Sequence, residues 1–210
     1  MAGSLPSPLA FASLTSLLLL ASCTSCEREC RPSTNFDLAV LADEVDTDCM
    51  IVVWNTGLTS LEGLEELRSA YLIDIRRNDQ LRDYSGLSVR SNGVTIWDNA
   101  GTDAIRLGPM EGHLSVTENG LRELEVVVQE QLSLAISEQE LERLALEGEG
   151  EVFLSLFGAE TPVVFTAPEE VTLGELRIDT APWLSTFSDI AAFGVPGTFL
   201  GLYDVDIDVA

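Results

Sequence analysis

The sequence predicts a mainly β protein, a right-handed parallel β-solenoid of about eight coils with minor helical turns. Short segments of alternating apolar residues recur from residue 50 onward, at intervals of roughly 18 to 24 residues. In the first four units an asparagine follows the alternating segment. Each segment is about four residues long and apolar on one side only, so it can bury that side only by stacking on its neighbours.

Residues 1 to 22 predict a signal peptide of the lipoprotein type. Residues 5 to 23 carry no charge, and their most apolar part, residues 14 to 21, is shorter than the ~20 residues that span a bilayer. The sequence LASC, which ends at Cys23, resembles the bacterial lipobox, and this resemblance implies cleavage before a lipid-modified Cys23. Thr24 is then compatible with sorting to the outer membrane. Because the first four residues contain no Lys or Arg, an ordinary secretory peptide is the alternative, so we expect an outer-membrane lipoprotein of the bacterial cell envelope or a secreted protein.

Residues 23 to 48 are expected to form a tether and an N-terminal cap, and residues 49 to 210 the repeat solenoid. If Cys23 carries a lipid, three cysteines remain, and export favours one disulfide among Cys26, Cys30 and Cys49. If Cys23 is free, two disulfides form in one of three pairings. Zinc is the competing interpretation of the CTSCEREC spacing, but the chain has a single histidine, His113, and we expect no metal site.

The first repeat units share a pattern of four positions: an aliphatic residue, an asparagine and two further core residues. The asparagines lie where the chain turns out of the strand, and an asparagine amide there bonds backbone groups of its own coil and the adjacent coil. We therefore expect a structural asparagine ladder of Asn55, Asn78, Asn99 and Asn119. The first two units show the frame at offsets of three, six and nine: Val52, Asn55, Leu58 and Leu61, then Ile75, Asn78, Leu81 and Tyr84.

The run NTGLTSLEGLEELRSAYLIDIRRNDQLRDYSGL resembles the receptor L-domain family, leucine-rich-repeat-like solenoids of insulin and epidermal growth factor receptor ectodomains and of many exported bacterial proteins. The resemblance covers residues 50 to 125. It implies a solenoid of leucine-rich-repeat type with a broad face that binds a protein or a glycan. The residues on the family's frame are Leu58, Leu61, Gly63 and Leu64, then Leu81, Gly86 and Leu87.

Beyond about residue 125 the asparagine is absent and the solenoid is expected to become irregular, with Pro162 and Pro182 in the loops. Ser137 and Glu140 have the spacing of a capping box, which favours a helical turn there. The C-terminal run DVDIDVA has period 2 and is expected to form a last strand with an acidic outer side.

The charge of the chain restricts its partners. Acidic residues outnumber basic ones 35 to 11, which gives a formal net charge of −24 at pH 7. Such a surface repels phosphate backbones, so nucleic acid is excluded as a partner, and a soluble monomer is expected. No phosphate-binding or dinucleotide-binding motif is present, and we expect no cofactor.

The outward strand positions give no sign of catalysis. One expected row combines a single acid and a single base and contains no acid pair; its members are Val53, Arg76, Trp97, Thr117, Ala135, Ser155, Asp179 and Tyr203. We expect a binding module and not an enzyme, with a polysaccharide-acting β-helix enzyme and a purely structural envelope spacer as alternatives. Trp97 is the candidate binding residue because it is aromatic and is expected to point outward.

Overall fold

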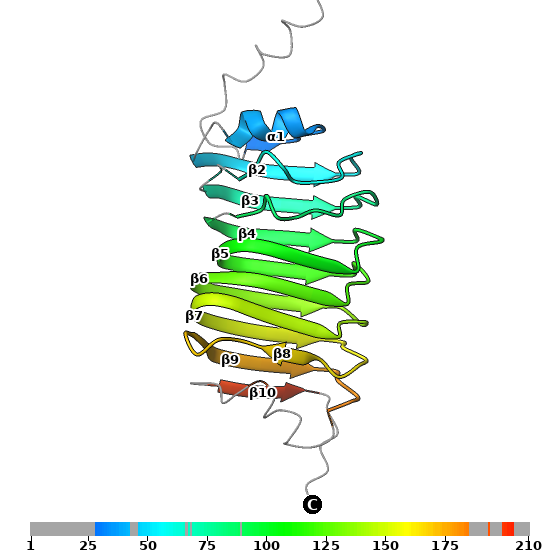
Figure 1. Ribbon diagram of the computed structural model, residues 1–210, viewed down its shortest axis with the longest axis vertical. Coiled ribbons are helices and arrows are strands. Elements are labelled where there is room, and N and C mark those ends of the chain that lie inside the picture. The colour runs from blue at the N-terminus through cyan, green and yellow to red at the C-terminus, as the bar shows by residue number, and fades with distance from the viewer. Residues whose placement is uncertain are drawn as a thin grey trace, which may run out of the picture.

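The chain winds as a parallel β-solenoid, as predicted, and the coils stack into a rod (Figure 1). The computed structural model describes residues 28–42, 46–65, 67, 69–88, 90–184, 193 and 199–203. The expected signal peptide, Cys23, Cys26 and the C-terminal run 204–210 lie outside the described residues.

Strand β1 (Arg28–Cys30) and helix α1 (Asn35–Ala42) precede the stack. Every strand pair is parallel, and each strand of the path pairs with the next one along the chain, except that β8 (Val164–Thr166) lies off the path and pairs with β7. The strands of the stack are β2 (Asp46–Trp54), β3 (Ser69–Arg76), β4 (Arg90–Trp97), β5 (Ala104–Thr117), β6 (Glu123–Ser137), β7 (Arg143–Phe157), β9 (Val171–Asp179) and β10 (Phe199–Tyr203).

The core is a set of columns of branched aliphatic side chains, one from each coil. Alternation directs every second side chain inward, and parallel register places equivalent residues above one another. Val53 pairs with Ile75, Ile75 with Ile96 and Ile96 with Val116, and all four side chains are fully buried. Segments that are too short to fold alone therefore share one continuous interior.

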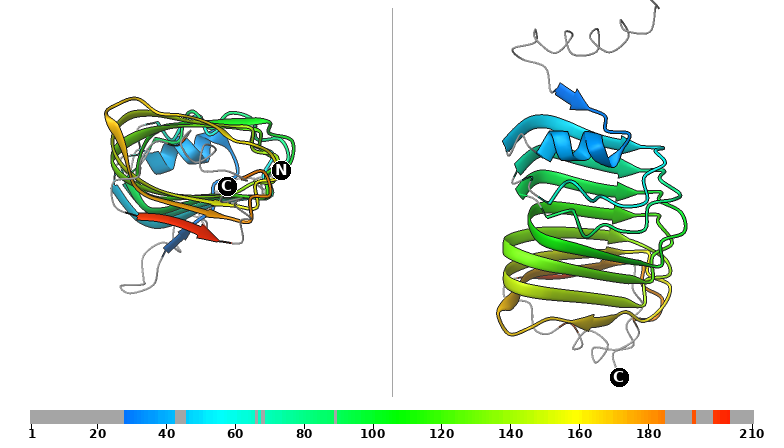
Figure 2. Two further views of the ribbon diagram at one scale, coloured as in Figure 1. Left: turned by 90° about the horizontal axis from the view of Figure 1, so that it is seen from below. Right: turned by 45° about the horizontal axis from the view of Figure 1, so that its top comes forward.

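The coils change form at β5. In the earlier coils the second side of the ring is a leucine-rich loop, with Leu61 and Leu64 in one coil and Tyr84 and Leu87 in the next, all buried. From β5 to β8 a strand replaces the loop, and the long strands β5, β6 and β7 run along both sides of the flattened ring (Figures 1 and 2).

The loss of the asparagine after residue 125 does not end the regularity of the stack. β6 and β7 pair over all 15 residues of each strand without a register shift. Their corners are formed by residues in the left-handed region, Glu130 with φ 60°, Gly148 with φ 86° and Gly150 with φ 138°.

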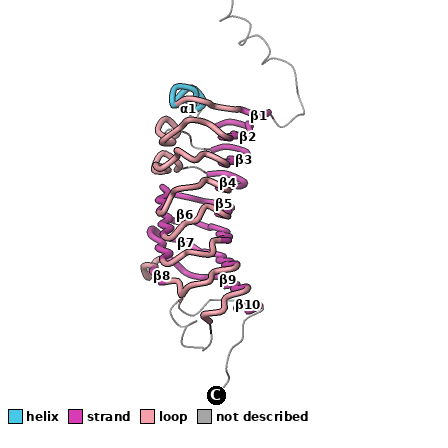
Figure 3. Tube along the Cα trace, turned by 90° about the vertical axis from the view of Figure 1, so that its right-hand side faces the viewer, coloured by secondary structure: helices cyan, strands magenta, loops and turns pink. Residues whose placement is uncertain are grey.

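The N-terminal end of the described stack is covered by a helix, whereas at the other end the inward side of β10 is partly exposed, with Leu200 39% exposed. Helix α1 lies over the first coil, where Leu38 enters the core and Asn35 Nδ2 donates to the carbonyl of Glu62 at 2.9 Å (Figures 1 and 3). Near β10, Phe193 stacks on Phe165 with ring centroids 5.2 Å apart and on Trp183 at 6.5 Å. The residues around Ser137 and Glu140 form a turn, not the expected helical turn, because β6 continues to Ser137 and β7 begins at Arg143.

Candidate functional site

Three of the four expected ladder asparagines form a buried ladder. The side-chain oxygen of Asn99 accepts the backbone N–H of Asn78 at 3.0 Å, and that of Asn119 accepts the N–H of Asn99 at 3.0 Å. Each side-chain nitrogen also donates to a carbonyl of the preceding coil; for Asn99 this is the carbonyl of Ile75 at 3.1 Å. The ladder thus satisfies backbone groups at the turn that the strands leave unpaired.

Asn55 does not belong to the ladder, so that part of the prediction is wrong. Asn55 is exposed with φ 51°, and its N–H donates to the carbonyl of Arg76. Thr56 occupies the ladder position instead, and its N–H and hydroxyl both donate to the Asn78 side-chain oxygen, at 2.9 and 2.8 Å. Between the ladder position and the bridge that joins Ser60 to Asp83, the first coil has one residue fewer than the second, which shifted the apparent offset.

The ladder ends on a buried glutamate that the sequence pattern did not reveal. The carboxylate of Glu138 is 2% exposed and accepts the N–H groups of Asn119, Gly120 and Leu121 at 2.9 to 3.2 Å. It also accepts Asn119 Nδ2 at 2.8 Å. Unlike Asn119, Glu138 follows its strand directly, without an intervening residue in the left-handed region. Its side chain is longer than that of asparagine, so its carboxylate still reaches the backbone N–H groups of the preceding coil.

The described cysteines lie at the first coil. Cys30 is buried and disulfide-bonded, so it is one of the paired cysteines among the three that were expected to supply a disulfide. Cys49 lies in β2.

Trp97 lies on the outer side of β4, where its indole Nε1 donates to Glu118 at 3.0 Å and the guanidinium of Arg77 stands 5.4 Å from its ring centroid.

The outer side of the main sheet forms a continuous surface, which we call the broad face. Parallel register corrects the expected outward row at three coils, where Trp54, Ser137 and Phe157 replace Val53, Ala135 and Ser155. The row next to the turns is Trp54, Arg76, Trp97, Thr117, Ser137, Phe157, Asp179 and Tyr203. The row beside it is Val52, Asp74, Thr95, Ser115, Ala135, Ser155, Arg177 and Gly201, and the two end members, Val52 and Gly201, are buried.

The charges of these two rows lie toward the ends of the stack and pair with each other. Arg76 is 3.3 Å from Asp74, and Arg177 is 3.6 Å from Asp179. Partial burial raises the pKa of Asp74, an effect that the charge of Arg76 opposes. Arg177 also lies over the ring of Tyr203, 4.5 Å from its centroid. Between these pairs, the outward residues of the two rows on β4 to β7 carry no charge.

The other side of the ring has a different character. We call it the short face; it is formed by the outward residues in the first halves of β5, β6 and β7 and by β8. Here Arg106 pairs with Glu125 at 2.7 Å, and Arg143 lies 3.8 Å from Glu123. The short face therefore shows the charged surface that an acidic chain is expected to present, whereas the centre of the broad face does not.

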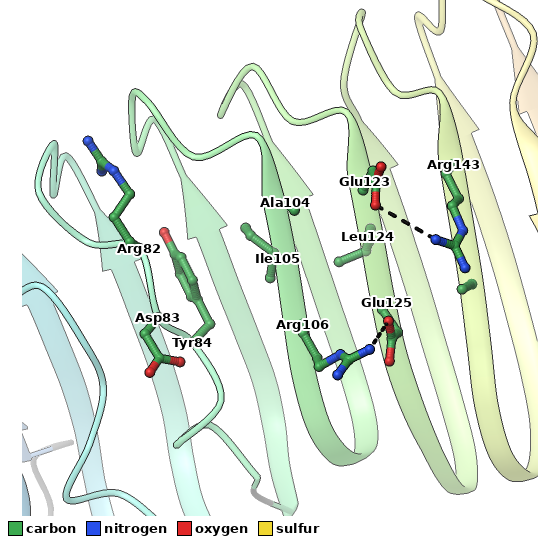
Figure 4. A pocket seen from close by; sticks show the side chains of 11 residues that line it. Arg82, Asp83, Tyr84, Ala104, Ile105, Arg106, Glu123, Leu124, Glu125 and Arg143 are labelled. Atoms are coloured by element: carbon green, nitrogen blue, oxygen red, sulfur yellow. Dashed lines mark hydrogen bonds and ion pairs between the residues drawn. The ribbon is translucent and has the colours of Figure 1, made fainter.

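A shallow hollow of about 260 Å³ lies on the short face, where the loop around Tyr84 gives way to β5 (Figure 4). Its wall includes Arg106 and Glu125, whose charges already neutralise each other. Tyr84 is 2% exposed, and burial raises the pKa of its phenol to about 12, which moves its ionisation further from neutral pH. The hollow offers neither an activated nucleophile nor an unpaired carboxylate pair.

The described residues also contain no cluster of three or more His, Cys, Asp or Glu side chains that could hold a metal ion. Within the same part of the chain, no helix has the length and apolar character needed to cross a membrane. Comparisons with protein-family models, curated proteins and solved structures find no match to this chain.

Proposed function

We propose that this protein is a lipid-anchored, non-catalytic binding module of the bacterial cell envelope, and that the broad face is its binding surface. The observation that carries the proposal is the contrast between the two faces. In a chain with a net charge of −24, the centre of the broad face holds uncharged and aromatic side chains, while the short face holds ion pairs. A surface kept free of charge and lined with aromatic residues is typical of an interface.

The carboxylates of the two outward rows favour binding over catalysis. Hydrolysis of a glycosidic bond commonly uses two carboxyl groups about 5 to 10 Å apart. Asp74 on β3 and Asp179 on β9 are five strand spacings apart, which is roughly 24 Å. Each is also neutralised by its own arginine. This arrangement speaks against a polysaccharide-cleaving site on the two rows.

The proposed location rests on the N-terminal sequence and on the cysteines. The LASC sequence ending at Cys23 supports lipid attachment, and the disulfide at Cys30 suits an oxidising compartment outside the cytosol. A solenoid of the leucine-rich-repeat type, held by its N-terminal end, then carries the broad face away from the membrane. A smooth structural spacer explains the stack equally well but gives no reason for the aromatic residues on one face.

The lipid anchor is tested by metabolic labelling of a Gram-negative host with a fatty-acid analogue. We expect the full chain to incorporate the label and Cys23→Ser to lose it, because the thiol of Cys23 is the proposed attachment point. Cys26→Ser serves as the control and should still be labelled. Equal labelling of the full chain and Cys23→Ser would contradict the anchor.

The binding surface is tested with two carboxylates placed on opposite faces. We expect envelope fragments, which contain both protein and glycan, to retain the lipidated full chain in detergent. Ala135→Glu, at the centre of the broad face, should reduce this retention by about tenfold, because the new carboxylate must lose its water on binding. Thr166→Glu on the short face should leave it unchanged. Equal retention of both variants would refute the broad face as the binding surface.

A further inference from the structure

The central part of the broad face is a low platform between aromatic side chains. We call it the hydroxyl floor; its members are Ser115 and Thr117 on β5 and Ser133, Ala135 and Ser137 on β6. Trp97 stands beside Thr117 on one side, and Phe157 stands beside Ser137 on the other. Trp97 and Phe157 are three strand spacings apart, roughly 14 Å.

The aromatic side chains are held in place by their neighbours. Arg77 lies over Trp97, and Arg177 lies 5.4 Å from the centroid of Phe157. Both aromatic residues keep part of their surface exposed to solvent. The floor itself is rigid, because residues 112–117 of β5 pair with residues 132–137 of β6, and these pair with β7, without a register shift. A ligand on this surface therefore meets a preorganised site.

Charge determines which class of partner fits this site. The hydroxyl floor has no charge, and the two arginines beside it, Arg77 and Arg177, are already paired with Asp98 and Asp179. The site therefore offers little to neutralise a charged ligand. A polyanion would also be repelled by the remainder of a molecule whose net charge is −24. A second copy of the chain carries the same −24 and is disfavoured for the same reason. The partner that complements the floor is uncharged.

The side chains indicate what kind of uncharged partner this is. Serine and threonine hydroxyls both donate and accept hydrogen bonds, as sugar hydroxyls do. Aromatic rings pack against the apolar C–H face of a pyranose ring. The hydroxyls also repeat along the stack at the strand spacing of ~4.8 Å, close to the advance of one sugar unit in an extended β-linked chain.

From these features we propose that the hydroxyl floor binds an uncharged β-linked glycan that runs along the stack, across the strands, between Trp97 and Phe157. The site spans about three sugar units at the strand spacing. This inference rests on the proposed function, because it names the ligand class of the same surface.

The test uses the lipidated full chain in detergent with amorphous cellulose and chitin as uncharged probes and alginate beads as the anionic probe. We expect retention on at least one uncharged polysaccharide and none on alginate. Ala135→Glu should lower the retention by about tenfold, and Thr166→Glu should not change it. Ser115→Ala with Ser137→Ala removes two floor hydroxyls without adding charge, and should weaken binding about threefold or more while thermal unfolding stays cooperative.

Three results would overturn the inference. Retention on alginate equal to that on cellulose and chitin would show that charge does not select the ligand. Retention that Ala135→Glu leaves unchanged would place the glycan elsewhere. Failure to bind either uncharged probe, while envelope fragments still distinguish Ala135→Glu from Thr166→Glu, would refute the glycan but leave the proposed binding face standing. If the two variants also behave alike on envelope fragments, the proposed function fails as well.

Discussion

Replacing Glu138 by alanine is expected to destabilise the protein by about 3 kcal/mol or more. The substitution removes the acceptor of three backbone N–H groups and of the Asn119 side-chain amide in a site that is 2% exposed. Each buried donor left without a partner costs about 1 to 3 kcal/mol, and water that enters the gap recovers part of this. Denaturation in guanidinium chloride, followed by circular dichroism, measures the loss.

Glu140 provides the matched control for Glu138. Its side chain is 66% exposed, and its closest described cation, Arg122, is 3.8 Å away. Exposed ion pairs of this kind contribute little, so Glu140→Ala should change the free energy of unfolding by about 0.5 kcal/mol or less. The loss of unfolding free energy in Glu138→Gln should lie between those of Glu138→Ala and Glu140→Ala. The amide keeps one acceptor oxygen, but it turns an NH2 group toward the N–H donors. If Glu138→Ala is no more destabilising than Glu140→Ala, the carboxylate does not terminate the ladder.

The fold was predictable because its main determinant is local and repeated. Alternating Val, Ile and Leu residues identify the inward side of each strand, and the recurrence interval identifies the stack. The same pattern placed Asn78, Asn99 and Asn119 correctly, since each follows its strand by the same number of residues. The prediction failed in the first coil, which has one residue fewer between the ladder position and the bridge at Ser60, so that Thr56 takes the place expected for Asn55.

The ladder glutamate could not be found from the asparagine pattern. At Glu138 the longer side chain replaces a residue of backbone, so both the residue type and its spacing change together. A repeat pattern can show that one residue type replaces another at a fixed position. It cannot show that a longer side chain one position earlier does the work of an asparagine one position later. A signal does exist in retrospect, because Glu138 directly follows the last strand position, where Thr117 in the previous coil is followed by Glu118 and then Asn119.

The broad face was only partly predictable. A slip of two residues keeps inward and outward sides unchanged, so alternation alone does not fix how far along a strand an outward residue lies. This is why Ala135 and Ser155 were placed in the row that Ser137 and Phe157 occupy. The contrast between an uncharged broad face and a charged short face needs the three-dimensional register, because both faces are formed by the same long strands.

Gly86→Ala is the second substitution expected to have a large effect, again about 3 kcal/mol or more. A methyl group at this position would contact the backbone carbonyl of Leu61 in the preceding coil, with its carbon only 2.8 Å from the carbonyl carbon. Backbone cannot move aside as a flexible side chain does, so the two coils must separate. The separation would strain the hydrogen bond from Leu61 N–H to the Asp83 carbonyl, which is 2.9 Å long.

Gly57 tests whether this effect comes from the close approach of coils and not from the loss of a glycine as such. A methyl group at Gly57 meets no atom within 4 Å, and the backbone there does not have a positive φ. Gly57→Ala should therefore be neutral or stabilising by up to about 1 kcal/mol, because alanine restricts the unfolded chain. Thermal and denaturant unfolding of both variants measures the difference. If the two substitutions destabilise the protein equally, the spacing between the leucine-rich loops does not limit the size of residue 86, and the packing that supports both faces of the solenoid must have another origin.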